Sequence, residues 1–376
     1  MIRKAMFSRR FINVVMKDFR AGGSYWLYRM MPQEKLFYPS AAEAIAQTME
    51  TRKMSLPFGS TLELTPSVAR FKSSREACLT LDFMPFYGLR RGEGKIVAVD
   101  SAGQTVMYDA DDGSIEMLPR LNAPHWQSPI SLCANKANAS GAQESSRSNA
   151  LYAINSSHSS EFRALVHYDP YGFGRSDEKK AWHWLHLPPP PYLDHPACED
   201  HTIQSYTLLE DGKTICFSSV PDKGGFGTYC FDTSNHQWAK AGGWVLPFHG
   251  RALQVPELHG LWFGIGDNQH ELRAVDLSSL DRAPKVLHRW RCSDPPNHWL
   301  LIGSSMVYLG ANRFCIARTF GAYTAPRKYF EQLTDTAAIL TGVEIVNAEA
   351  NKTKLRMVEH KSRTYIFERC GIESVF

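Results

Sequence analysis

SYTLLEDGKTICFSSV, at residues 205–220, consists of two β-rich runs joined by the turn Glu210-Asp211-Gly212-Lys213. Glycine supplies the positive φ of a tight hairpin turn, so the passage predicts two antiparallel strands. Two further β-rich runs follow, TYCFD at 228–232 and WAKAGGWVLPF at 238–248. Four strands in about 45 residues is the length of one β-propeller blade. The stretch therefore predicts an all-β fold built from such blades.

The same four-strand plan recurs along the chain. In several units the third strand ends in an aromatic or apolar residue followed by aspartate. These pairs are Tyr108-Asp109, Tyr168-Asp169, Phe231-Asp232 and Val275-Asp276. Five units can be counted between about residues 77 and 367, and strand-like segments at 12–19 and 24–31 remain. A closed propeller commonly completes its last blade with strands from both chain ends. We therefore expect about six four-stranded blades closed by the N-terminal strands, with five or seven as alternatives.

The domain organisation follows from this count. Residues 1–10 are expected to form a basic tail, and residues 11–376 a single β-propeller domain. The small, polar segment 133–149 is expected to be a flexible inserted loop. A short helix is expected near residues 41–52, because Ser40 and Glu43 form a capping box before an Ala-rich run.

Two residue types of the repeat have expected structural roles. The aspartate at the end of the third strand can accept backbone N–H groups of the next turn. Trp238 begins the fourth strand of its unit. Its large, flat indole can insert between neighbouring blades. The repeat residues are therefore interpreted as architectural.

The amino-acid composition limits the classes of partner that the protein is expected to bind. The 42 Lys and Arg residues are scattered among 38 Asp and Glu residues, which gives a net charge of +4. Because nucleic-acid binders usually concentrate basic residues, no nucleic-acid partner is expected. No apolar run reaches the length of a membrane-spanning helix, so no membrane partner is expected either. The eight cysteines are not closely paired, and several lie in apolar runs, which favours buried reduced thiols over a disulfide framework.

The protein is expected to be a monomer in the cytoplasm or nucleus. Residues 1–17 contain five basic residues and no acidic residue. A mitochondrial presequence has this character, which makes mitochondrial import a minority alternative.

The aspartate pairs, Trp238 and the Gly-Gly pairs resemble a degenerate kelch repeat. More specifically, the chain resembles a plant family of uncharacterised kelch-like proteins, expanded in grasses, known as domain of unknown function 1668. The segments that carry the resemblance are RRFINVV at 9–15, LFYPS at 36–40, GGWVLPFHGRALQVPELHGLWFG at 242–264 and VYLGANRFCIARTF at 307–320. The resemblance implies a kelch-like propeller over nearly the whole chain, but no activity, because the family has none established. The Gly-Gly pairs do not recur in every unit, as they would in a true kelch protein.

The sequence motifs that could indicate a metal site or a catalytic site are weak. His195, Cys198 and His201 in the segment DHPACEDH are spaced so that three ligands could approach one Zn²⁺. A structural zinc site normally takes four ligands, so a polar loop is the favoured interpretation and no metal or cofactor is expected. The chain has no Gly-x-Ser-x-Gly elbow and no dinucleotide fingerprint. The protein is therefore expected not to be an enzyme.

Function is expected to lie in loops on one face of the propeller, which include a long loop expected over 319–338. Long loops on a rigid scaffold often carry recognition, and Tyr and Arg contribute strongly to interfaces. The candidate partner-binding residues are Phe226, His270, Tyr323, Arg327 and Tyr329. The favoured function is a non-enzymatic protein-interaction scaffold. Its alternatives are an enzyme or small-ligand binder at a pocket on the propeller axis, and a substrate-recognition subunit of a ubiquitin ligase that lacks its own F-box.

Overall fold

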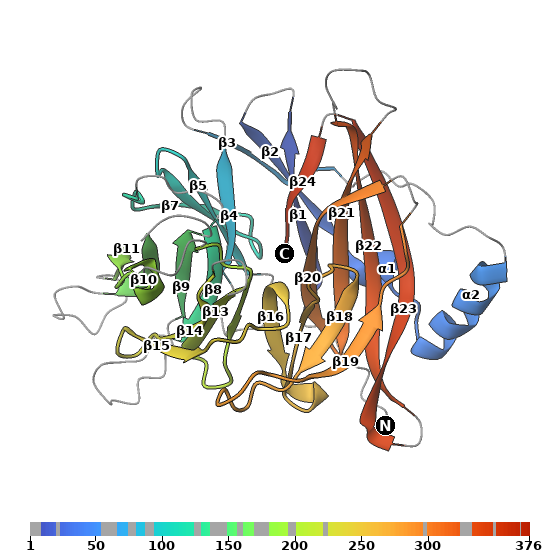
Figure 1. The fold of residues 1–376 in the computed structure, drawn as a ribbon. Helices are drawn as coiled ribbons and strands as arrows, with labels where there is room; N and C mark the ends of the chain where they lie inside the picture. The colour runs from blue at the N-terminus through green and yellow to red at the C-terminus, as the bar shows by residue number, and fades with distance from the viewer. Residues whose placement is uncertain are drawn as a thin grey trace, which may run out of the picture.

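The protein is all-β, with strands grouped mainly in sheets of four (Figure 1). The computed structural model describes residues 9–19, 23–53, 66–73, 80–86, 94–123, 129–135, 149–155, 161–168, 180–194, 201–220, 225–295, 299–323, 333–348, 351–368 and 370–376. Neither of the two α-helices in this part of the chain is long and apolar enough to cross a membrane.

Two separate four-stranded sheets follow one another early in the chain. Each is a meander in which consecutive strands pair antiparallel, as the hairpin turns of the sequence predict. The first contains β4 (Leu81–Phe86), β5 (Lys95–Asp100), β6 (Thr105–Asp109) and β7 (Ile115–Leu118). The second contains β8 (Pro129–Asn135), β9 (Asn149–Asn155), β10 (Phe162–Tyr168) and β11 (Ala181–His186).

The middle of the chain forms one eight-stranded sheet made of two meanders. Its first half is β12 (Ser205–Leu208), β13 (Thr214–Ser219), β14 (Gly227–Asp232) and β15 (Gln237–Gly242). Its second half is β16 (His249–Val255), β17 (Leu261–Ile265), β18 (Glu271–Val275) and β19 (Val286–Arg291). The strands of the two halves pair where β12 runs parallel to β16, with Ser205 opposite Gly250 and Tyr206 opposite Arg251.

The last meander has the longest strands. It consists of β20 (Trp299–Gly310), β21 (Arg313–Tyr323), β22 (Leu333–Ala348) and β23 (Asn351–Glu368). The long loop expected over 319–338 is wrong in extent, because β21 continues to Tyr323 and β22 starts at Leu333. The two strands pair from Arg313–Glu344 to Tyr323–Leu333, so the hairpin ladder absorbs much of the expected loop.

A sheet made from both chain ends completes the architecture. Its order is β24 (Cys370–Val375), β1 (Ile12–Asp18), β2 (Ser24–Met30) and β3 (Ala69–Lys72). β1 pairs antiparallel with both β2 and β24, which confirms that N-terminal strands join the C-terminus in one sheet. Neither β3 nor β24 was predicted from the sequence, and each is a strand because it pairs with β2 or β1, respectively.

The two helices lie between β2 and β3 in the sequence. The short α1 (Pro32–Leu36) was not expected, whereas α2 (Ala41–Lys53) matches the expected helix. The Ser40 Oγ accepts the backbone N–H of Glu43 at 3.2 Å, which is the capping bond that the sequence predicts. In Figure 1, α2 lies outside β23.

A buried polar cluster attaches this helical segment to the last meander. The Glu344 carboxylate accepts from Arg313 Nε at 3.0 Å and is 3.1 Å from His360 Nε2. His360 Nδ1 accepts the Tyr38 backbone N–H at 3.2 Å, so its Nε2 carries the proton given to Glu344. Burial would raise the pKa of Glu344, but the His360 hydrogen bond and the Arg313 charge lower it overall.

The strand-end aspartates and the tryptophans stabilise the repeat. Oδ1 of Asp109, Asp232 and Asp276 each accepts the backbone N–H two residues later, at 2.9, 2.7 and 2.9 Å. The paired aromatic residue points into the core: Phe231 and Tyr108 are 0% and 4% exposed, and Tyr168 packs against the same cluster as Phe231. Asp169 lies outside the described residues.

Indole hydrogen bonds join consecutive meanders. Trp238 Nε1 donates to the Pro188 carbonyl at 3.0 Å, just after β11, and its ring packs against Phe162 and Phe231. Trp184 on β11 repeats this bond to the Pro119 carbonyl at 3.1 Å, just after β7. Each tryptophan therefore bridges from its own outer strand to the outer strand of the preceding unit.

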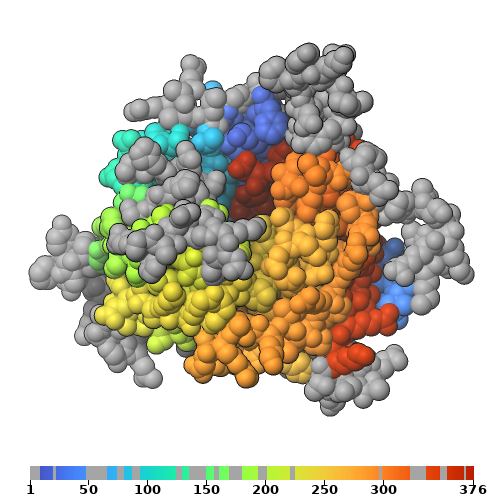
Figure 2. Space-filling model, in the orientation of Figure 1, coloured from blue at the N-terminus to red at the C-terminus, as the bar shows by residue number. Residues whose placement is uncertain are grey.

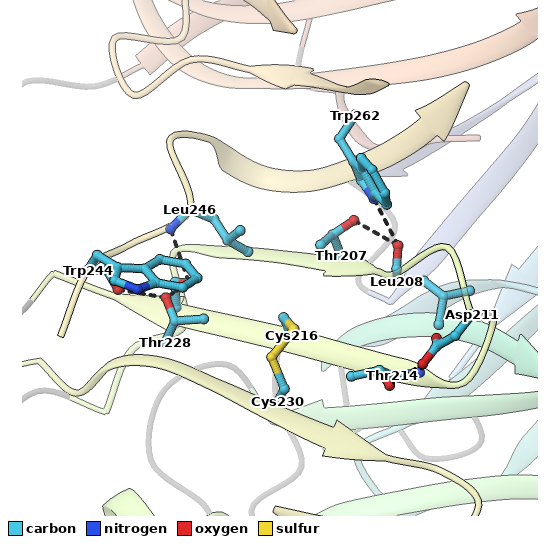
Figure 3. Close-up of a disulfide and its surroundings, with 11 residues drawn as sticks. Thr207, Leu208, Asp211, Thr214, Cys216, Thr228, Cys230, Trp244, Leu246 and Trp262 are labelled. Atoms are coloured by element: carbon cyan, nitrogen blue, oxygen red, sulfur yellow. Dashed lines mark hydrogen bonds between the residues drawn. A yellow bond between two sulfur atoms is a disulfide. The ribbon is translucent and has the colours of Figure 1, made fainter. Parts of the chain in front are cut away.

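The expectation of reduced thiols is wrong for one pair. Cys216 on β13 and Cys230 on β14 form a disulfide (Figure 3). They are directly opposite in the antiparallel register, with Cα atoms 4.1 Å apart, so pairing of the strands brings their sulfur atoms together. Nearby, Trp262 Nε1 on β17 donates to the Leu208 carbonyl at 3.0 Å and helps join the two halves of the eight-stranded sheet.

Candidate functional site

The six innermost strands, β4, β8, β12, β16, β20 and β24, surround one cavity of about 630 Å³, called here the central cavity. Each strand is the first of its set of four, counted from the inside, and each contributes to the wall. Representative lining residues, one from each strand, are Phe83, Ser131, Tyr206, Arg251, Ser305 and Glu373. In Figure 2 the red C-terminal strand lies at the bottom of a recess between the blue N-terminal strands and the orange segment that includes β20.

Two charged residues enter the central cavity at irregularities in their strands. In β16, His249 is opposite Ile265 but Leu253 is opposite Phe263, so the intervening residues, including Arg251, bulge. Gly250 has φ of +72°, a conformation that favours glycine and turns the chain just before Arg251. β-Bulges commonly redirect side chains next to binding sites.

The second bulge lies in β24. Ser374 is opposite Val15, whereas Ile372 is opposite Met16, which leaves Glu373 as the extra residue without a cross-strand partner. Glu373 lines the cavity, and its side chain is exposed. The carboxylate therefore leaves the regular ladder and faces the cavity.

The electrostatics of the cavity are set by a few groups. Burial by the cavity walls raises the pKa of Glu373, and the nearby charge of Lys17 opposes that rise. Burial also raises the pKa of the Tyr206 hydroxyl, against the charge of Arg251, which lies opposite it in the parallel register. Burial lowers the pKa of His249, with Asp267 acting against the shift, so this imidazole is neutral at pH 7.

The polar and charged groups of the cavity could contact a ligand. Glu373 is the one carboxylate among the described residues that line the cavity. The other polar lining groups are hydroxyls, a neutral imidazole and guanidinium groups, which hold a ligand by hydrogen bonds and charge.

The weak metal candidates are not brought together by any described contact. His195 and Cys198 lie outside the described residues, and the His201 ring packs 6.3 Å from the Tyr192 ring. In the part of the chain that the structure describes, no group of three or more His, Cys, Asp or Glu residues could hold a metal ion.

The candidate partner-binding residues lie in different environments in the structure. Phe226 is 6% exposed and stacks on Tyr192 with ring centroids 3.6 Å apart, so its expected place on an accessible surface is wrong. Because the Phe226 ring is large and apolar, it packs in the core. His270 is half-buried, at the turn between β17 and β18. Tyr323 ends β21, while Arg327 and Tyr329 lie outside the described residues, so their roles stay predictions.

Sequence reasoning did not identify Tyr206, Arg251 or Glu373 as site residues. One signal was present for Arg251: Gly250 interrupts a strand-like run, and a glycine inside a strand often marks a bulge. For Glu373 no such signal exists, because the strand that carries it was not predicted.

Comparison with solved structures finds distant likeness only. A protein of unknown function from Bacteroides thetaiotaomicron VPI-5482 has 11% identity and a TM-score of 0.36, over 69% of this chain and 55% of its own. PorZ, a surface component of the type-IX secretion system of Porphyromonas gingivalis, has 10% identity and a TM-score of 0.31, over 78% of this chain and 47% of its own. The chain thus spans about half the length of these two proteins. Dihydro-heme d1 dehydrogenase NirN has 12% identity and a TM-score of 0.31, over 98% of this chain and 76% of its own.

A search of curated protein sequences finds no match. A family model, described as protein of unknown function (DUF1668), matches residues 9–365. This match spans all the sheets, from β1 into β23, and leaves only the final strand and the chain ends outside. The chain therefore belongs to the DUF1668 family.

Proposed function

We propose that the protein is a six-bladed, kelch-like β-propeller that acts as a non-catalytic binding protein, with the central cavity as the binding site for a small polar molecule. The observation that carries the proposal is that the inner strands of all six four-stranded sets line one cavity of about 630 Å³. Small-molecule sites commonly have volumes of about 300–1,000 Å³ and a few convergent polar groups.

The absence of catalysis is part of the proposal. A single cavity carboxylate supports binding over cleavage by a carboxylate pair, since among the described lining residues no second carboxylate accompanies Glu373. A rigid ring of strands is suited to a fixed arrangement of contacts, since side chains on strands are held by their neighbours.

The test fills the cavity. Ser305 on β20 is half-buried and lines the cavity, so Ser305→Phe should reduce its volume without removing a charge. Leu300→Phe is the matched control, on the same strand at a side chain that is 56% exposed and outside the cavity lining. Purified proteins would be compared by native mass spectrometry for co-purified small molecules and by thermal shift against a metabolite panel.

We expect at least one molecule to bind wild type and Leu300→Phe, and to bind Ser305→Phe at least about tenfold more weakly, because the added ring occupies ligand volume. Equal binding to all three proteins would contradict the proposal. So would a panel in which nothing stabilises the wild type.

A protein-interaction scaffold is the second candidate. Ile115 and Met117 on the outer edge strand β7 are 62% and 70% exposed, and exposed apolar side chains on an edge favour contact with another chain. A pull-down that compares wild type with Ile115→Ser plus Met117→Ser tests it: a partner lost only from the variant supports the scaffold. A role as a ubiquitin-ligase subunit stays a prediction from sequence.

A further inference from the structure

The last meander contains a buried arginine, Arg318, on β21. Its side chain is 1% exposed, and in the described part of the chain its Nε and Nη1 atoms have no hydrogen-bond partner. A guanidinium stays charged in proteins and carries five N–H donors. Buried polar groups are normally hydrogen-bonded, and buried charges are normally paired. Arg318 therefore requires a compensating group.

Apolar side chains flank Arg318 on its own face of the sheet. Ile316 and Phe320, two residues before and after it, are 1% and 0% exposed. Ile316 packs in one cluster with Phe263 of β17, so this face lies against the second half of the eight-stranded sheet. Phe320 packs in another cluster with Ile339, which is opposite Arg318 on β22. The Phe320 ring centre is 5.8 Å from Arg318 Cζ, and a ring face attracts a cation only weakly.

A buried thiol, Cys292, responds to the charges of this region. Burial raises the pKa of Cys292 to about 12, the charge of Arg318 opposes that rise, and the charges of Glu359 and Glu271 add to it. The thiol is therefore neutral at pH 7 and supplies no negative charge to the guanidinium.

The two carboxylates of the region bind other groups. Glu271 accepts from Arg273 Nε at 3.2 Å. Glu359 accepts the backbone N–H and the hydroxyl of Ser293 at 3.1 and 2.6 Å. Among the described residues, neither carboxylate accepts from Nε or Nη1 of Arg318. The positive charge of Arg318 is therefore not neutralised by a direct contact with either of them.

We propose that Arg318 binds a small monovalent anion, of about the size of chloride, between the last meander and the second half of the eight-stranded sheet. Burial of the guanidinium excludes a large ligand, and one negative charge matches one arginine. Thr364 lies in the same row of the sheet as Arg318, is 4% exposed and has an Oγ1 without a partner among the described residues, so its hydroxyl is a second donor. Arg318 does not line the central cavity, so this site is separate from the proposed function and does not depend on it.

The first experiment locates the ion. Crystals of the full-length protein would be soaked in sodium bromide, because bromide replaces chloride and scatters X-rays anomalously. An anomalous peak is expected within hydrogen-bonding distance of Nε or Nη1 of Arg318. The proposal is overturned if that position holds no anomalous peak, if its density is explained by water alone, or if bromide is found only at exposed residues.

The second experiment measures the chloride dependence of urea unfolding. Sodium chloride would be replaced by sodium gluconate at a constant ionic strength of about 0.15 M, because gluconate is too large for a buried site. The unfolding equilibrium constant of the wild type is expected to be at least about tenfold lower in chloride, since a ligand that binds only the folded state stabilises it. Equal constants in the two salts would contradict the proposal.

Substitutions assign the effect to one side chain. Arg318→Met removes the charge but keeps an extended side chain, so it should abolish the chloride dependence. In gluconate it should be at least as stable as the wild type, because it removes an uncompensated buried charge. Arg318→Lys should keep part of the dependence, since it retains a charge without the planar guanidinium. Arg291→Met is the matched control, because it removes one positive charge from a neighbouring side chain that is 70% exposed, and it should keep the full dependence.

The proposal also fails if Arg318→Met keeps the chloride dependence of the wild type and is destabilised equally in both salts, because Arg318 would then have a purely structural role. If Arg318→Met does not fold, the bromide experiment on the wild type still decides the question. Neither experiment involves the central cavity, so their failure leaves the comparison of Ser305→Phe with Leu300→Phe unaffected.

Discussion

The indole bridge between meanders makes a quantitative prediction at Trp238. Trp238→Phe keeps an aromatic ring against Phe162 and Phe231 but removes the 3.0 Å bond from Nε1 to the Pro188 carbonyl. Because the Pro188 end is exposed and water can replace the donor, the loss should be about 1 kcal/mol. Trp238→Ala also removes the ring from this aromatic cluster and should cost about 3–5 kcal/mol.

The assay is urea unfolding at pH 7. Unfolding would be monitored by far-UV circular dichroism, so that the loss of a tryptophan fluorophore does not affect the signal. Trp184→Phe should lose a similar amount, since its Nε1 makes the equivalent bond to the Pro119 carbonyl at 3.1 Å. Trp290→Phe is the control, because its ring stacks on Phe263 and no described residue accepts its indole N–H. The reasoning is refuted if Trp290→Phe lowers the free energy of unfolding as much as Trp238→Phe does. It is also refuted if Trp238→Phe and Trp238→Ala lower it equally, because the hydrogen bond to Pro188 would then not explain the loss.

Three further perturbations test other parts of the fold. Glu344→Gln should lose about 1–3 kcal/mol at pH 7. The pKa of Glu344 is lower in the folded protein than in the unfolded chain. Its contribution to the free energy of unfolding is therefore complete above the unfolded pKa of about 4.3 and is lost as pH falls through the folded pKa. Urea unfolding at pH 3 should accordingly show a smaller difference in stability between Glu344→Gln and wild type. Cys216→Ala plus Cys230→Ala should lose about 3 kcal/mol under oxidising conditions, since the bridge closes a loop with a sequence separation of 14, and reductant should shrink the difference from wild type. Ser40→Ala should lower stability by about 1 kcal/mol, because the N–H of Glu43 loses its cap, whereas Ser40→Asp should restore it.

The sequence predicted those parts of the fold in which local signals agree. Alternating β-rich runs and the turn at Glu210–Lys213 predict β12 and β13 because a hairpin register is set by its own turn. By contrast, β3 (ARFK) and β24 (CGIESV) are short and have little β-rich pattern. They are strands because β2 and β1 offer them edges, which is a tertiary effect that local propensity does not contain.

Most residues of the candidate site could not be predicted from the sequence, for a related reason. A bulge is a mismatch between two paired strands, so it exists only in the register. Arg251 and Glu373 look like ordinary surface residues until Leu253 is known to face Phe263 and Ser374 to face Val15. The sequence favours aromatic loop residues as partner contacts, yet Phe226 is in the core, because aromatic side chains also pack well in cores.

The position of Glu373 couples closure of the fold to the chemistry of the cavity. β24 is held to β1 in the sheet that contains both chain ends, and the same strand supplies the cavity carboxylate. A ligand that contacts Glu373 can therefore bind only while β24 is paired, so binding must stabilise the closed sheet by RT ln(1 + [L]/Kd). Conversely, anything that loosens β24 must weaken ligand binding by the same linkage. A ligand bound in the cavity as proposed would therefore stabilise the sheet in which the two chain ends pair.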